Sequence, residues 1–222
     1  MEEILVKLSE CVEFGKINEK SPYPPSMRGQ KGASELTAEA LEAGISPQVL
    51  LNEALIAAMG RVGEKFTQGK IFVPQMLLSA KAMNEAMSHL KKYISSGAIK
   101  AKGTFIIGTV MGDLHDIGKN LVAMMVEGSG WKVIDLGTDV GADKYVAALN
   151  DYPDAYCGMS ALLTTTMTNM GPMIRQIHEK YPRTKIIVGG APVNAKFAQE
   201  VGADAYANNP QENIEWLNSL IN

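Results

Sequence analysis

The chain reads FIIGTV from Phe105 to Val110, then DLHDIG from Asp113 to Gly118, then NLVAMMVE from Asn120 to Glu127. This order predicts a buried β-strand that leads through a short polar loop into a helix. His115 lies in the loop, just after the predicted strand. Because open α/β sheets form their binding crevices at the carboxyl ends of their strands, His115 is a candidate functional residue.

The rest of the second half continues the alternation of strand and helix that is typical of βαβ units. The predicted strands are Thr104–Val110, Lys132–Leu136, Ala155–Ser160, Lys185–Val188 and Ala203–Ala207. The predicted helices are Ile117–Gly128, Ala142–Asn150, Thr166–Tyr181, Val193–Val201 and Glu212–Ile221. We therefore expect a doubly wound, flavodoxin-like (Rossmann-type) five-stranded parallel sheet in the strand order 2-1-3-4-5, with helices on both faces.

The first half has apolar residues at helical spacing. It predicts four helices, which cover Glu3–Phe14, Ser34–Ala43, the stretch from Pro47 to Phe66 and the stretch from Val73 to Leu90. Four helices with short connections predict a four-helix bundle. The expected domains are a helical domain over residues 1–94, a linker over 95–103 and an α/β domain over 104–222.

The composition argues against several classes of function. The formal net charge is −3 at pH 7, which is unlike a nucleic-acid-binding surface. No apolar run approaches the roughly 20 residues that span a bilayer, so no membrane association is expected. Cys11 and Cys157 are far apart and in no metal-type spacing. The expected location is therefore the reducing cytoplasm.

Three segments are expected to meet at the carboxyl edge of the predicted sheet. They contain His115 after the first strand, Ser160 to Thr166 after the third, and Gly189-Gly190 after the fourth. Each segment also has a purely structural interpretation. In this interpretation, the histidine is solvated, Gly118 permits close helix packing, the glycine pair forms a turn, and the serine and threonine residues cap a helix.

His115 and Asp113 have the chemistry of a metal ligand and its orienting partner. Imidazole is a common metal ligand, and a carboxylate bonded to its other nitrogen fixes the tautomer. A bare ion such as zinc usually needs three or four protein ligands, and neither His89 nor His178 forms a cluster with His115. A single histidine therefore favours a metal that a macrocycle already holds and that needs only an axial ligand.

The combination of motifs resembles the cobalamin-binding family. The stretch from Asp113 to Gly118 resembles its DxHxxG signature, Ser160-Ala-Leu162 resembles its SxL element, and Gly189-Gly190 resembles its GG element. The first half resembles the helical cap that precedes this module in methionine synthase and in corrinoid methyltransferase proteins. The cap motifs are Val62-Gly63-Glu-Lys-Phe66, Phe72-Val73-Pro74-Gln and Ser79-Ala-Lys-Ala-Met83.

The resemblance implies a role for each of these residues. His115 would be the lower axial ligand of cobalt in a cobalamin whose own base is displaced. Asp113 would bond the other side of the His115 ring, and Thr166 would extend that relay. Phe66 and Val73 would cover the upper face of the corrin. The other implied cofactor-binding residues are Asp116, Ile117, Gly118, Ser160, Leu162, Thr164, Gly189 and Gly190.

One segment near the end of the chain departs from the family's pattern. Ala205-Tyr-Ala-Asn208-Asn209 stands where acidic or small residues are more usual. It lies near the end of the stretch that the resemblance covers, which extends from about residue 34 to residue 209.

The function implied by the resemblance is methyl carriage by a protein that is not catalytic alone. A substrate:corrinoid methyltransferase would load the methyl group, and a corrinoid:tetrahydrofolate or corrinoid:thiol methyltransferase would remove it. A reductive activating protein would be a third partner. The alternatives are a cobalamin-dependent sensory or regulatory module, a fragment of an adenosylcobalamin mutase and an empty structural domain. A mutase needs a substrate barrel, and a sensor needs an output element that the sequence does not show.

Overall fold

A computed structural model of the protein describes residues 2–221, apart from the side chain of Ser95. The chain forms two compact units. One contains the chain up to Ala101 together with Gly128–Gly130, and the other contains Lys102–Glu127 and the chain from Trp131 onward. No helix within the described residues is long and apolar enough to span a membrane.

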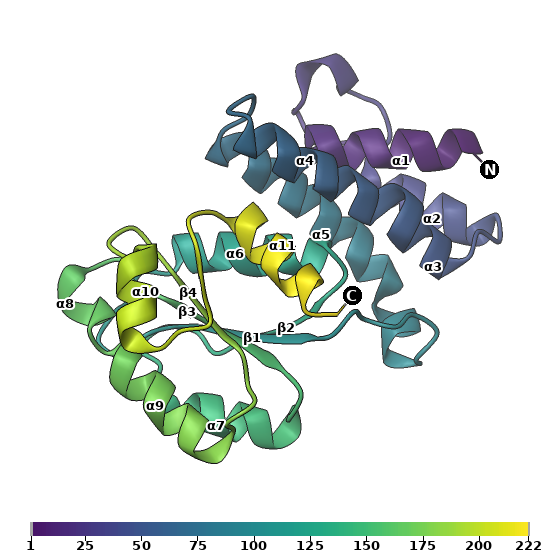
Figure 1. Ribbon diagram of the computed structural model, residues 1–222. Helices are drawn as coiled ribbons and strands as arrows, with labels where there is room; N and C mark the ends of the chain where they lie inside the picture. The colour runs from purple at the N-terminus through teal and green to yellow at the C-terminus, as the bar shows by residue number, and fades with distance from the viewer. Residues whose placement is uncertain (1, 222) are drawn as a thin grey trace. The chain divides into compact units, whose positions relative to one another are not determined.

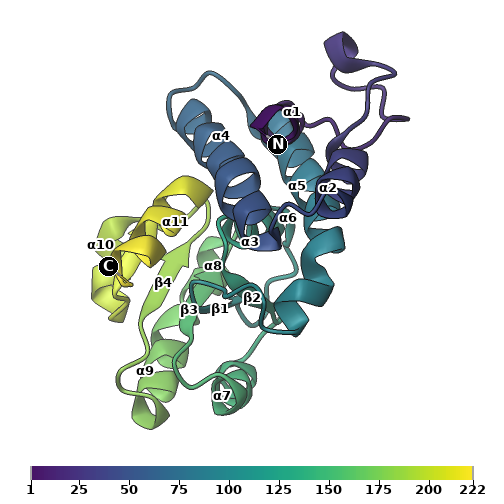
Figure 2. The ribbon, with the colours of Figure 1, turned by 90° about the vertical axis from the view of Figure 1, so that its right-hand side faces the viewer.

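The first unit is built from helices, and the predicted helices are confirmed. They are α1 (Glu2–Phe14), α2 (Ala33–Glu42), α3 (Pro47–Val49), η2 (Leu50–Ile56), α4 (Ala57–Thr67) and α5 (Val73–Ser95), with a short 3-10 turn, η1 (Pro25–Met27), after α1. The segments α3, η2 and α4 follow one another without a break, and the middle segment has π geometry. Figure 2 shows α1, α2, α4 and α5 side by side, and their buried apolar residues form the core of this unit.

The second unit contains a five-stranded parallel sheet, as predicted. Its strands are β1 (Thr104–Thr109), β2 (Lys132–Asp135), β3 (Tyr156–Ser160), β4 (Ile186–Gly189) and β5 (Ala205–Ala207), in the order β2-β1-β3-β4-β5. Thr109 of β1 pairs with Ser160 of β3, and Ser160 pairs with Gly189 of β4. The three central strands therefore end at the same level and present their following loops together.

Helices cover both faces of the sheet (Figure 1). One face carries α6 (Ile117–Gly128) and α11 (Pro210–Ser219), and the other carries α7 (Ala142–Asp151), α9 (Met170–Lys180) and α10 (Ala195–Val201). The layer under α7, α9 and α10 is a core of buried apolar side chains that includes Ile106, Leu149, Ile174 and Ile186. Burial on both faces explains why β1 is apolar at successive positions rather than at alternate ones.

The predicted helix Thr166–Tyr181 is wrong in its extent. The structure has a short helix, α8 (Thr164–Met167), and a separate α9 after it. Pro172 has no backbone N–H and cannot bond the carbonyl of Thr168, so the helical bonding pattern is interrupted there. The sequence from β3 to α9 therefore contains a bend that a single helix would not allow.

Candidate functional site

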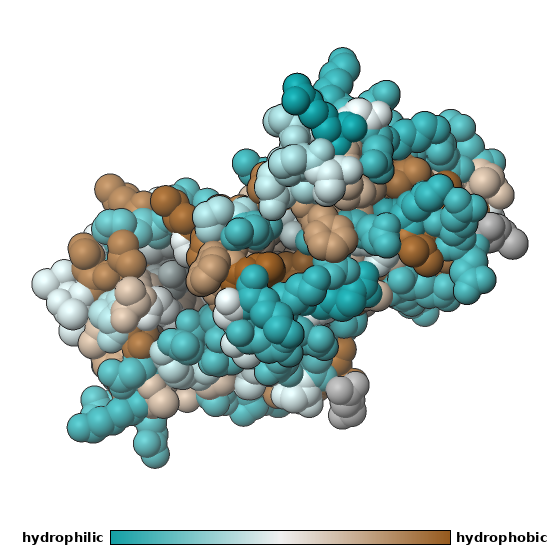
Figure 3. Space-filling model, turned by 90° about the horizontal axis from the view of Figure 1, so that it is seen from above, coloured by the Kyte–Doolittle hydropathy of each residue, from teal (hydrophilic) through white to brown (hydrophobic). Residues whose placement is uncertain are grey.

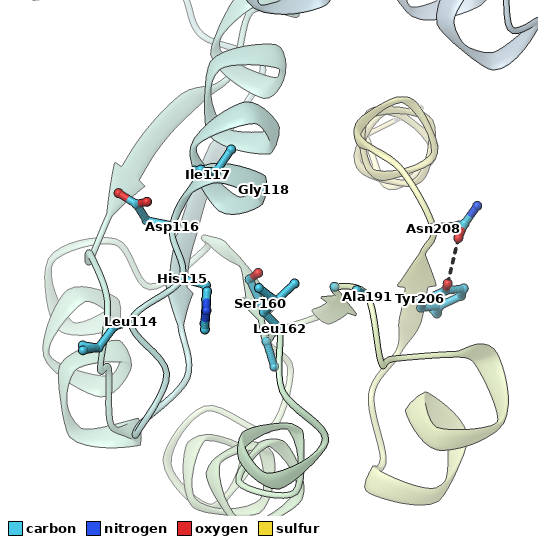
Figure 4. A pocket seen from close by; sticks show the side chains of 12 residues that line it. Leu114, His115, Asp116, Ile117, Gly118, Ser160, Leu162, Ala191, Tyr206 and Asn208 are labelled. Carbon is cyan, nitrogen blue, oxygen red and sulfur yellow. Dashed lines mark hydrogen bonds between the residues drawn. The ribbon is translucent and has the colours of Figure 1, made fainter. Parts of the chain in front are cut away.

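A cavity of about 620 Å³ opens at the carboxyl edge of the sheet. Its walls come from the loop after β1, the start of α6, the end of β3, the loop after β4, and β5 with the residue that follows it. Figure 4 shows His115 on one side of the cavity and Tyr206 and Asn208 on the other, with Ser160 and Leu162 between them. The cavity lies where the strand order predicts a binding crevice.

Most of the site residues expected from the sequence come together here. The cavity is lined by His115, Asp116, Ile117, Gly118, Ser160, Leu162 and Gly190. Asp113 and Thr166 are buried and connect to His115 through hydrogen bonds. Thr164 and Gly189 are not among the residues that line the cavity. Phe66 and Val73 belong to the helical unit, where Phe66 is half-buried and Val73 is 40% exposed.

Sequence reasoning missed the wall that faces His115 across the cavity. Tyr206 of β5 and Asn208 after it both line the cavity, and the Tyr206 hydroxyl donates to Asn208 Oδ1 at 3.1 Å (Figure 4). Ala191 after β4 also lines it. The departure of the segment around Tyr206 from the family's pattern was the available signal, because residues at the carboxyl end of a fifth parallel strand can face the same crevice.

Asp113 joins the loop after β1 to the loop after β3. Its Oδ1 accepts hydrogen bonds from His115 Nδ1 at 2.7 Å and from the His115 backbone N–H at 3.0 Å. Its Oδ2 accepts from Thr166 Oγ1 at 2.6 Å and from the backbone N–H groups of Leu162 at 2.8 Å and Leu163 at 3.4 Å. Asp113 is fully buried. The orientation of the His115 ring therefore depends on a carboxylate that is itself held from several directions.

Asp113 is ionised despite its burial. Burial by itself raises the pKa of Asp113, but the hydrogen bonds from Thr166, Leu162 and His115 outweigh it and hold the pKa well below its usual range. An ionised carboxylate only accepts hydrogen bonds, so His115 Nδ1 is the donor. In the neutral ring the lone pair is then on Nε2. The His115 side chain is 50% exposed, so this nitrogen is open to a ligand.

Two glycines shape the cavity in different ways. A Cβ at Gly118 would have no atom within 4 Å apart from its chain neighbours and its own helix turn. Close helix packing therefore does not explain Gly118, and the free space belongs to the cavity. A Cβ at Gly190 would lie 1.9 Å from the carbonyl oxygen of Ala161, at a residue whose φ is +119°. Gly190 is thus required for the close approach of two backbone segments.

Gly118→Leu is expected to leave the α/β unit folded and to lower its affinity for added cobalamin at least about tenfold, because the new side chain fills the cavity. Gly60→Leu is the matched control, since a Cβ at this helical glycine of α4 also meets no atom within 4 Å. Absorbance titration of the cofactor-free chains with cobalamin measures the effect. Equal affinities for the two variants would show that the space beside Gly118 is not a cofactor site.

The chemistry of the cavity suits a metal held by a macrocycle better than a bare ion. Residues 2–221 contain no group of three or more His, Cys, Asp or Glu side chains that could hold a metal ion. His115 offers one nitrogen. Around it, Leu114, Ile117 and Leu162 are 74%, 74% and 45% exposed. The face seen in Figure 3 is mostly hydrophilic, with apolar groups gathered in a few places. A flat apolar ring system that needs one axial ligand fits this combination.

Comparison with known proteins agrees with this chemistry. A family model described as a B12 binding domain matches residues 103–215, and a second model with the same description matches residues 30–91. These matches define a B12-binding protein with cobalamin or a related corrinoid as its cofactor. Trimethylamine corrinoid protein 1 of Methanosarcina mazei is 40% identical over 193 residues, which are 85% of this chain and 89% of the relative. Dimethylamine corrinoid protein 3 of Methanosarcina acetivorans is 35% identical over 185 residues, 82% of this chain and 87% of the relative. The chain belongs to the corrinoid protein family of methyltransferase systems.

Solved structures show the same fold over almost the whole chain. The methanol:cobalamin methyltransferase complex MtaBC from Methanosarcina barkeri contains a chain that matches with a TM-score of 0.83 and 29% identity, over 99% of this chain and 80% of that one. A cobalamin-binding protein from Desulfitobacterium hafniense matches with a TM-score of 0.73 and 26% identity, over 97% of both chains. The protein is therefore a corrinoid carrier, and these relatives give no support to the sensory alternative.

Proposed function

We propose that this protein holds its corrinoid through His115, as the lower axial ligand of cobalt, with Asp113 and Thr166 fixing the ring from behind. The observation that carries the proposal is the direction of the His115 hydrogen bond. Nδ1 is bonded to a buried carboxylate that only accepts, so Nε2 keeps its lone pair beside the cavity. A metal ligand of this kind must be unprotonated at the coordinating nitrogen.

The other residues of the cavity would hold the remainder of the cofactor. When bound, the corrinoid supplies a cobalt that accepts a methyl group and gives it up again. Gly118 leaves room beside α6, Leu162 provides an apolar wall, and the Tyr206–Asn208 pair provides polar groups on the facing wall. Phe66 and Val73 are proposed to cover the reactive face. Both are apolar, and Val73 has 40% of its surface exposed and free to contact a ring.

The partners follow from the role of a carrier. We propose that a substrate:corrinoid methyltransferase loads the methyl group, that a corrinoid:tetrahydrofolate or corrinoid:thiol methyltransferase unloads it, and that a reductive activating protein is a third partner. The relatives and solved structures are named for trimethylamine, dimethylamine, monomethylamine or methanol, although each of them matches more than four fifths of this chain. Choice of the methyl donor is therefore assigned to the partner enzyme rather than to this chain. The cytoplasm remains the proposed location, and both cysteines are free thiols.

Axial ligation by His115 can be tested directly with nitrogen isotopes. The chain is produced with natural or ¹⁵N-labelled histidine, loaded with cobalamin and reduced to the cobalt(II) form for electron paramagnetic resonance. An axial histidine nitrogen is expected to split each cobalt line into a triplet with ¹⁴N and into a doublet with ¹⁵N. His115→Ala is expected to abolish the isotope effect, because the coordinating nitrogen is removed.

His178→Ala is the matched control for this experiment. Its ring lies in α9, where Nε2 is 3.0 Å from the carbonyl oxygen of Thr184, outside the cavity. This variant should keep the doublet of the labelled protein. A spectrum of the unsubstituted chain that does not respond to ¹⁵N-histidine would mean that the cofactor's own base, or water, occupies the axial position.

A further inference from the structure

Two side chains from other loops, both outside the cavity, bond the loop that carries Asp113 and His115. This ligand loop, residues 110–116, connects β1 to α6. Asp139 contacts it from the segment between β2 and α7, and Asn169 contacts it from the bend between α8 and α9. Neither side chain lines the cavity. Both therefore act on the site only through the backbone of the ligand loop.

Asp139 makes two hydrogen bonds to backbone groups of the loop, one at Gly112 and one at Asp113. Its Oδ1 accepts the backbone N–H of Gly112 at 2.7 Å, and its own backbone N–H donates to the carbonyl oxygen of Asp113 at 3.0 Å. The bonds hold the peptide group between Met111 and Gly112 and the carbonyl group of Asp113. They therefore fix the position from which the Asp113 carboxylate reaches the His115 ring.

The backbone of Asp139 is itself unusual. Its φ is +53°, and among residues 2–221 it is the non-glycine residue that has a positive φ. A left-handed conformation is unfavourable for a residue with a Cβ, although aspartate and asparagine tolerate it better than most. Such a conformation persists only where the surrounding contacts enforce it. Here the contacts around Asp139 are its two bonds to the ligand loop and the bond from the Val140 N–H to the carbonyl oxygen of Thr109 at 2.9 Å.

Asn169 holds the other side of the same loop. Its Nδ2 donates to the carbonyl oxygen of Met111 at 2.7 Å, and its backbone N–H donates to the carbonyl oxygen of Thr166 at 3.0 Å. Thr166 in turn donates to Asp113. The break between α8 and α9 thus brings one residue into contact with both the ligand loop and the segment that carries the hydroxyl partner of Asp113.

We propose that Asp139 is a positioning residue for His115. Through Gly112 and Asp113 it holds the carboxylate where it selects the ring tautomer with the proton on Nδ1 and the lone pair on Nε2. Functional groups need placement within about 0.5 Å to act, and the Asp139 carboxylate accepts the Gly112 N–H one residue before Asp113. Loss of the Asp139 carboxylate releases the Gly112 peptide and lets the Asp113 carboxylate move away from Nδ1.

Two substitutions distinguish the effect of the Asp139 carboxylate from the effect of the Asp139 backbone conformation. Asp139→Gly accepts a positive φ without strain but has no side-chain acceptor. Asp139→Asn also tolerates this conformation and keeps an Oδ1 that can accept from Gly112. If Asp139 acts only through backbone strain, both variants should have the same tautomer ratio of the His115 ring. If Asp139 positions the Asp113 carboxylate, only Asp139→Gly should change the tautomer ratio of the His115 ring.

The readout is the tautomer of His115 in the cofactor-free protein, measured by ¹⁵N–¹H correlation spectra of histidine rings. The three histidines are assigned from the His115→Ala and His178→Ala spectra. In the unsubstituted chain and in Asp139→Asn, the Nδ1-protonated form should dominate. In Asp139→Gly, the ratio of the Nε2-protonated to the Nδ1-protonated form should rise by about fivefold, as expected from the loss of one hydrogen bond.

The proposal is overturned if Asp139→Gly keeps the tautomer ratio of the unsubstituted chain, or if Asp139→Asn changes it as much as Asp139→Gly does. The link to cobalt rests on the proposed function, but the tautomer measurement does not, because it uses the protein without cofactor. Failure of axial ligation in the isotope experiment and failure of positioning by Asp139 are therefore distinguishable. Tryptophan fluorescence during urea unfolding verifies that each variant is folded, since Trp131 and Trp216 both lie in the α/β unit.

Discussion

Gly190→Ala is expected to lower the free energy of unfolding of the α/β unit by at least about 3 kcal/mol. The added Cβ would lie 1.9 Å from the carbonyl oxygen of Ala161 and 2.9 Å from its carbonyl carbon. Both neighbours are backbone atoms of the residue directly after β3, so no side-chain rotation relieves the contact. The two strands must separate where their ends form the cavity, and cobalamin binding should fall together with stability.

Gly202→Ala is the control that isolates the cost of the backbone conformation. Gly202 has a φ of +79°, but a Cβ there would have no atom within 4 Å. We expect this variant to lose only about 1 kcal/mol, the cost of a left-handed residue with a Cβ. Urea unfolding followed by tryptophan fluorescence compares the two. Equal losses would show that contact with Ala161 is not the reason for glycine at position 190.

The fold could be predicted to a large extent because its signals are local and periodic. The helix α6 has the predicted bounds, Ile117–Gly128, since a polar loop precedes it and a glycine ends it. The strand order also followed from the alternation of strands and helices. The prediction was less accurate where the cap of a helix extends into the start of a predicted strand. β5 begins at Ala205 and not at Ala203, because the Ala203 N–H bonds the carbonyl of Ala198 at the end of α10.

The candidate site could also be predicted only in part from the sequence. Asp113 and His115 stand two residues apart in one loop, so their chemistry was visible in the sequence. Asp139 and Asn169 come from two other loops and act through bonds between a side chain and a backbone group, which leave no periodic pattern in a sequence. Tyr206 was visible only as a departure from the family's motif. Contacts between segments distant in the chain are therefore what the structure adds.

Asp113→Asn is expected to remove axial ligation while leaving the imidazole of His115 in place. The amide that replaces the carboxylate must turn its NH₂ group either toward Thr166 and the backbone of Leu162 or toward His115. The second orientation keeps the acceptor for Leu162 and Thr166 and is therefore favoured. The NH₂ group then donates to His115 Nδ1, which requires the proton of the ring to move to Nε2. A protonated Nε2 cannot bind cobalt.

The same substitution should lower the free energy of unfolding by about 2 kcal/mol, because the backbone N–H of His115 loses its buried acceptor. Asp204→Asn is the matched control. Asp204 also accepts a backbone N–H, from Ile186 at 2.8 Å, but at the opposite end of β4. Asp204→Asn should lower the free energy of unfolding without changing the axial ligation of cobalt. If Asp113→Asn keeps the ¹⁵N-histidine doublet in the cobalt(II) spectrum, the carboxylate does not control the tautomer. The ring would then be oriented by cobalt itself, and the buried Asp113 network would serve only to join the loops after β1 and β3.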